Sequence, residues 1–76
     1  MPNRMPRVTG EQAVKAFCES GYAIDRIAGS HRILKHPNKI ERLSIPVHAG
    51  KTLGVGLLSS LIKTAGLTVE QFSALL

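Results

Sequence analysis

The first hydrophobic block of the chain repeats with the period of a helix. Its apolar side chains stand three and four residues apart: Ala13, Val14, Phe17 and Cys18. This spacing is typical of a helix that buries one face. Thr9 and Gln12 form the capping-box pattern of a helix start, and Gly21 is a natural stop. The pattern predicts a helix over residues 10–20.

The middle of the chain changes to shorter apolar groups separated by turn residues. The segment "YAIDRIA" (22–28) is followed by Gly29–Ser30, and "HRILKHP" (31–37) runs into the turn "PNK". In "IERLSIPVH" (40–48), apolar and polar residues alternate, which is typical of a strand with one apolar face. Three strands joined by short turns indicate an antiparallel meander.

The last third of the chain returns to helical spacing. The segment "LLSSLIKTAGL" (57–67) carries apolar residues three and four apart, and Gly66 is suited to end the helix. Thr68 and Gln71 repeat the capping-box pattern, which predicts a second, short terminal helix. We expect the glycine-containing segment "AGKTLGVG" (49–56) to be a flexible connection.

The order of these elements predicts an α+β fold of one small domain. A chain of 76 residues forms one domain and not two. We expect residues 1–8 to form a flexible N-terminal arm and residues 9–76 the single domain. Helices packed on one face of the three-stranded sheet would leave the other face open to solvent or to a partner. A core this thin argues against a large substrate pocket.

The charge of the chain points to a polyanionic partner. Ten lysines and arginines against five acidic residues give a net charge of +5. This excess favours nucleic acid as the partner, with an acidic protein as the second candidate. The single cysteine, Cys18, rules out an intramolecular disulfide. No apolar run is long enough for a membrane span or a secretory signal, so we expect a cytoplasmic protein without a membrane partner.

The chemistry-bearing residues gather between positions 28 and 48. This segment holds all three histidines together with four basic residues: His31, His36, His48, Arg32, Lys35, Lys39 and Arg42. RNA carries its own nucleophile, the 2′-hydroxyl. Its cleavage needs that hydroxyl deprotonated, the 5′-oxygen protonated and the charged phosphorane stabilised. Histidine beside lysine and arginine can supply these roles without a metal ion or another cofactor.

His31 is the strongest catalytic candidate of the three histidines. It follows Gly29–Ser30 at a predicted strand start, where a turn can expose the ring and bring backbone N–H groups to a phosphate. His36 precedes Pro37 at a turn, where a structural role is equally expected. Strand alternation places His31 and His36 on opposite faces. Both faces also carry apolar residues, so periodicity leaves open which one is buried.

Other interpretations of the same residues remain open. The histidine spacing fits neither usual zinc pattern, since no second cysteine and no compact helical pair is present. The segment Gly50-Lys51-Thr52 lacks the earlier glycine of a phosphate-binding P-loop. A non-catalytic RNA-binding module would show the same basic residues. So would an interaction protein that docks an acidic partner.

Several motifs in order resemble the HicA family of small bacterial and archaeal toxins. They are "GYAIDRIAGSHRILKHP", "IPVHAGKTLGVG" and "LIKTAGLTVEQF". The resemblance extends from Thr9 to Leu76. It implies an α-β-β-β-α fold like that of double-stranded-RNA-binding domains. It also implies ribosome-independent cleavage of mRNA and neutralisation by a HicB antitoxin.

The resemblance also implies roles for individual residues. The catalytic histidine of the family corresponds to His31, while His48, Gly50 and Lys51 match a second motif that could contact RNA or the partner. Together with the basic segment, this gives eight expected RNA-binding residues: Gly29, Ser30, Arg32, Lys35, Lys39, Arg42, His48 and Lys51. Neither a metal ion nor a cofactor is implied. We expect a monomer when no antitoxin is bound.

Overall fold

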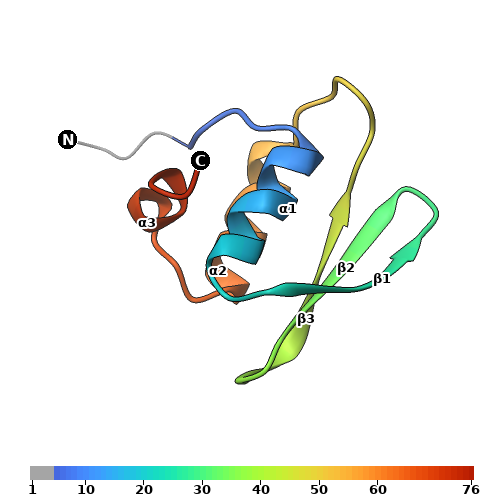
Figure 1. Ribbon diagram of the computed structural model, residues 1–76. Helices are drawn as coiled ribbons and strands as arrows, with labels where there is room; N and C mark the ends of the chain where they lie inside the picture. The colour runs from blue at the N-terminus through green and yellow to red at the C-terminus, as the bar shows by residue number, and fades with distance from the viewer. Residues whose placement is uncertain (1–4) are drawn as a thin grey trace.

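The computed structural model describes residues 5–76. Its elements follow one another as expected, helix first, then three strands, then two helices (Figure 1). They are α1 (Gly10–Glu19), β1 (Ala23–Ala28), β2 (His31–His36), β3 (Lys39–Pro46), α2 (Val55–Thr64) and α3 (Val69–Ser73). The predicted α-β-β-β-α order is confirmed.

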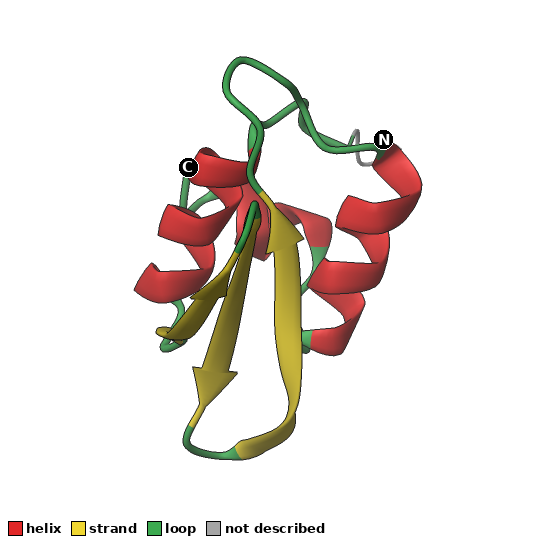
Figure 2. Cartoon of the chain, turned by 90° about the vertical axis from the view of Figure 1, so that its right-hand side faces the viewer, coloured by secondary structure: helices red, strands yellow, loops and turns green. Residues whose placement is uncertain are grey.

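The sheet and the helices form two layers. The strands pair antiparallel in the order β1-β2-β3, with β2 in the centre. All three helices lie on the same side of this sheet, and Figure 2 looks onto its other side, with the sheet in front of the helices. The predicted α+β arrangement with helices on one face is therefore confirmed. We call the uncovered side the open face of the sheet.

The hydrophobic core fills the space between the two layers. Phe17 of α1 and Phe72 of α3 are fully buried, with ring centroids 4.9 Å apart. Leu34 of β2 and Leu43 of β3 are equally buried and point from the sheet toward the helices. Burying a side chain of this size contributes roughly 1.5–3 kcal/mol. The short helix α3 is therefore held mainly through Phe72.

Both predicted capping boxes are present. The Thr9 hydroxyl accepts a hydrogen bond from the Gln12 N–H at 3.2 Å, and the Gln12 side chain accepts one from the Thr9 N–H at 2.9 Å. Thr68 and Gln71 make the same two bonds at 3.0 and 2.9 Å at the start of α3. A side-chain cap contributes about 1 kcal/mol to stability. These local bonds fix where both helices begin.

The connection over residues 49–56 is more firmly attached than we expected. Leu53 is buried, and its N–H donates to the Val8 carbonyl oxygen at 2.8 Å. Thr52 bridges to Thr9 beside it. Of the predicted N-terminal arm, residues 1–4 lie outside the described part of the chain. Val8 is only 3% exposed and Met5 packs against the core, so the packed unit reaches back beyond Thr9.

Strand β3 ends two residues before the predicted strand did, and proline explains the difference. Pro46 has no N–H and so cannot donate to the ladder. The next N–H, that of Val47, donates instead to the carbonyl oxygen of Ser30 at 2.7 Å. Because Ser30 lies in the β1–β2 turn, this bond joins the end of β3 to that turn.

Candidate functional site

The pairing of β2 determines which side chains reach the open face. Leu34 points into the core, as does its partner Leu43. Since neighbouring residues of a strand face opposite ways, His31, Ile33 and Lys35 point to the open face. This resolves the ambiguity that the periodicity of β2 left.

A β-bulge in β1 changes which residues of that strand share the open face. Ile24 pairs with Leu34, but Arg26 pairs with Ile33, so Asp25 is an extra residue in β1. A bulge of this kind reverses the facing of the residues that follow it. Arg26 therefore points to the open face. Simple alternation would instead have placed it on the helix-facing side, together with Ile24.

His31 stands exposed at one end of the open face. Its partners across the sheet are Ala28 on β1 and Pro46 on β3. Gly29 in the preceding turn has φ of +59°, a left-handed conformation that glycine adopts without strain. The predicted exposure of His31 after the Gly29–Ser30 turn is confirmed.

His48 and Lys51 lie at this same end of the sheet. The Ser30–Val47 hydrogen bond brings the chain after β3 alongside the β1–β2 turn. His48 follows directly, and its carbonyl oxygen accepts from the Lys51 N–H at 3.1 Å in a turn. Both side chains are exposed. We call Gly29, Ser30, His31, His48 and Lys51 together the His31 end of the sheet.

His36 lies at the other end of β2 and has a structural environment. Its Nδ1 accepts a hydrogen bond from the Asn38 N–H at 3.1 Å. Its ring packs edge-on against Tyr22, with centroids 5.1 Å apart. A Cβ at Gly21 would come within 2.8 Å of its Nε2. The ring therefore closes the β2–β3 turn and covers Tyr22.

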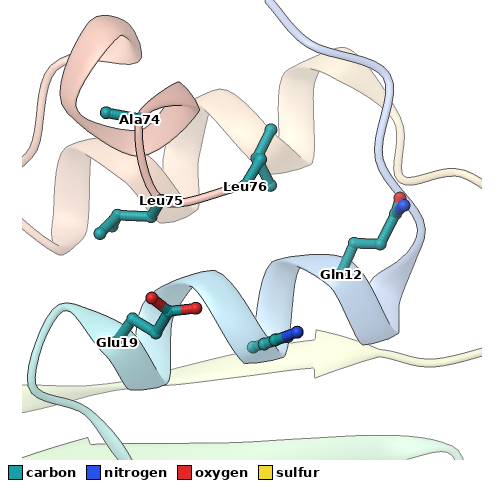
Figure 3. A pocket seen from close by; sticks show the side chains of 6 residues that line it. Gln12, Glu19, Ala74, Leu75 and Leu76 are labelled. Carbon is teal, nitrogen blue, oxygen red and sulfur yellow. The ribbon is translucent and has the colours of Figure 1, made fainter.

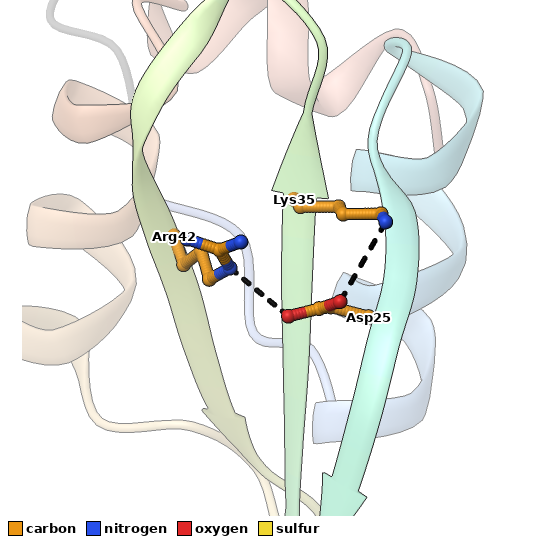
Figure 4. A network of polar contacts seen from close by, with 3 residues as sticks. All are labelled: Asp25, Lys35 and Arg42. Atoms are coloured by element: carbon orange, nitrogen blue, oxygen red, sulfur yellow. Dashed lines mark hydrogen bonds and ion pairs between the residues drawn. The ribbon is translucent and has the colours of Figure 1, made fainter.

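Lys35 and Arg42 share one carboxylate on the open face. Asp25 accepts a hydrogen bond from the Arg42 Nε at 3.0 Å and lies 3.6 Å from the Lys35 Nζ, as the dashed lines in Figure 4 mark. The hydrogen bond from Arg42, with the positive charges of both partners, lowers the pKa of Asp25. Asp25 therefore stays ionised at pH values at which an ordinary aspartate would become protonated.

The two remaining predicted RNA-binding residues lie elsewhere. Arg32 is half-buried on the helix-facing side, between Ile27 and Ile45. Lys39 is at the far end of the sheet, where its Nζ would be 3.2 Å from a Cβ at Gly66. The eight predicted residues thus fall into four places: the His31 end, the pair held by Asp25, and the separate positions of Arg32 and Lys39.

Arg26 was missed by the sequence analysis. It is exposed on the open face, diagonally across from His31. Strict alternation along "AIDRIA" places Arg26 on the apolar face with Ile24, so the sequence carried no signal for it. Only the strand register shows its position.

The described residues, 5–76, do not build a metal-binding group, and one cleft that they form lies away from the His31 end. Among them, no three His, Cys, Asp or Glu side chains cluster closely enough to hold a metal ion. A cleft of about 370 Å³ lies between α1 and the segment after α3, and its lining includes Gln12, Glu19 and Leu76 (Figure 3). It contains no predicted site residue. No helix in this part of the chain is long and apolar enough to span a membrane.

Most of the chain matches the model of a known protein family. Residues 10–67 match the family model described as "HicA toxin of bacterial toxin-antitoxin". The match runs from the first residue of α1 past the end of α2, so it includes the whole sheet and the His31 end. A search of curated proteins found no match. On this evidence the chain belongs to the HicA family, the toxins of bacterial toxin–antitoxin systems, and membership implies an antitoxin partner.

Proposed function

We propose that this toxin is an endoribonuclease that cleaves mRNA with His31 as its acid–base residue. The observation that carries the proposal is the position of His31, exposed on the open face next to the Gly29–Ser30 turn. A substrate as large as RNA reaches such a surface without needing a pocket. An imidazole changes protonation near physiological pH, which suits it to proton transfer in this reaction.

The proposed reaction is a transesterification within the RNA. The 2′-oxygen loses its proton and attacks the adjacent phosphorus, and the bond from phosphorus to the 5′-oxygen breaks. The products are a 2′,3′-cyclic phosphate and a 5′-hydroxyl that has taken up a proton. His31 carries out one of the two proton transfers. Neighbouring donors stabilise the negative charge on the phosphorane.

The residues around His31 supply groups that bind phosphate. Ser30 and His48 offer side-chain hydrogen-bond donors, and Lys51 offers a positive charge beside them. The glycine at position 29 lets a phosphate approach the backbone, because no side chain stands there. Binding through such contacts weakens as salt rises.

The proposed partner is a HicB-like antitoxin that covers the His31 end. Covering this exposed surface would stop RNA from reaching the imidazole. Free of this partner, we expect the toxin to be a cytoplasmic monomer. Co-expression with the neighbouring reading frame would yield a stable complex, and the complex would not cut RNA.

RNA digestion by the purified chain and by His31→Ala, both with a chelator present, tests the proposal. We expect the wild-type chain to cut RNA and the variant to bind RNA without cutting it. Lys63→Ala, an exposed change on α2, serves as the control and should cut normally. Binding without cutting by the wild-type chain would instead identify a non-catalytic RNA-binding module.

A further inference from the structure

The three cations that β1, β2 and β3 place on the open face differ in their surroundings. Lys35 and Arg42 both contact Asp25. Arg26 is exposed and takes part in no ion pair or side-chain hydrogen bond within residues 5–76. It is therefore the cation of this face whose charge is not already matched by a carboxylate.

Asp25 limits what Lys35 and Arg42 can offer a phosphate. The three groups together carry a net charge of one, not two. A phosphate that approached either cation would also meet the carboxylate, which repels it. The Asp25 carboxylate lies 3.0 Å from the Arg42 Nε and 3.6 Å from the Lys35 Nζ, so its negative charge acts at close range on a phosphate that approaches either cation.

Arg26 is well placed relative to His31. It stands opposite Ile33, and His31 is two residues from Ile33 along β2. Diagonal neighbours of this kind in an antiparallel pair have Cα atoms roughly 7–8 Å apart. Lys35 is four residues from His31 along the strand, which corresponds to roughly 13 Å. A guanidinium also matches a phosphate with two parallel hydrogen bonds.

We propose that Arg26 binds an RNA phosphate beside the one presented to His31, and that Asp25 withholds Lys35 and Arg42 from the RNA. The RNA backbone then crosses the His31 end of the sheet, from β1 toward His48 and Lys51. It does not run along β2 past Lys35. This inference rests on the proposed function, because it takes RNA as the ligand of the open face.

The salt dependence of RNA binding tests the inference. The probe is a mixed-sequence 2′-O-methyl oligoribonucleotide, which cannot be cleaved through its 2′-oxygen. Each phosphate contact in a single strand contributes about 0.7 to the slope of log K against log salt. Arg26→Gln should lower the slope by about this amount. Lys35→Gln and Arg42→Gln should each leave it nearly unchanged.

Asp25→Asn provides the complementary measurement. Removing the carboxylate frees Lys35 and Arg42, so we expect a steeper slope and tighter RNA binding. Two exposed helix residues give controls of equal charge change away from the sheet: Lys63→Gln for Arg26→Gln, and Glu70→Gln for Asp25→Asn. Both controls should bind RNA with the wild-type slope. Thermal unfolding of each variant verifies that it is folded.

The outcomes separate this inference from the proposed function. If Arg26→Gln and Lys35→Gln lowered the slope of log K against log salt by equal amounts, the inference would be overturned and the nuclease proposal would stand. A wild-type chain that binds the oligonucleotide through Arg26 but never cuts RNA would overturn the proposed catalysis alone. A folded wild-type chain that binds no RNA would overturn both.

Discussion

Gly10 lies directly against the carbonyl oxygen of Pro46, and a Cβ at position 10 would overlap that oxygen. Gly10 is the first residue of α1 and Pro46 is the last residue of β3. Pro46 is also the partner of His31 across the sheet. The start of the first helix is therefore packed against the strand end that supports the His31 end of the sheet.

We predict that Gly10→Ala destabilises the fold, although alanine is the better helix former. The added methyl would force apart α1 and β3, and overpacking of this kind costs about 1–3 kcal/mol. Gly56→Ala is the matched control, because nothing lies within 4 Å of a Cβ at that position in α2. It should be neutral or stabilising. Urea unfolding of both variants makes the comparison, and equal stabilities would contradict the proposed contact.

The two histidines of β2 should respond differently to alanine. His36→Ala removes the bond to the Asn38 N–H and the packing against Tyr22. Each of these contacts is worth about 1 kcal/mol, so we expect a loss of about 2 kcal/mol. His31→Ala changes an exposed side chain and should shift stability by less than about 0.5 kcal/mol. Chemical denaturation of both variants measures this. A larger loss for His31→Ala than for His36→Ala would show that the environments are misassigned.

The buried hydroxyl of Tyr22 can be removed by substitution with phenylalanine. The residue is 4% exposed, and its hydroxyl has no hydrogen-bond partner within the described residues. Burial, with the negative charge of Glu41, raises the pKa of this hydroxyl. Because an unsatisfied buried hydroxyl is costly, Tyr22→Phe should stabilise the fold by about 1 kcal/mol. A drop in melting temperature for this variant would indicate a hydrogen bond that the hydroxyl makes in solution.

The Asp25 network should make stability depend on pH in the acid range. Folding lowers the pKa of Asp25, mainly through the hydrogen bond from Arg42. The network therefore adds stability above the ordinary aspartate pKa of about 3.9, and this is lost as pH falls through the lower folded-state value. Asp25→Asn should be less stable than the wild-type chain at neutral pH and equally stable in strong acid. Unfolding curves over this range test it, with Glu70→Gln as control for net charge. A stability difference that is the same at every pH would contradict this.

Local chemistry made the helices predictable. The capping boxes at Thr9 and Thr68 depend on residues three apart in sequence, so they could be recognised without knowing the fold. The turn at Gly29–Ser30 was predictable for the same reason, because the residues that mark it are adjacent in the sequence. These features need no information about what packs against them.

Strand pairing was harder to predict because it joins distant residues. In β2 both faces carry an apolar residue, and only the partner Leu43 shows that Leu34 faces the core. The grouping of the basic residues depended on the same register. Arg32 and Lys35, three apart in sequence, lie on opposite sides of the sheet. The catalytic role of His31 remains a prediction.

The extra residue at Asp25 also matters for reading related sequences. Two chains of this fold could differ in length by one residue in β1 and still present the same charges to a ligand. Two others could have the same residues in β1 and present different charges, if only one of them has the bulge. Column-by-column comparison would then pair Arg26 with a side chain that points at the helices. Relatives are therefore better compared by the pairing register of their strands than by sequence alignment alone.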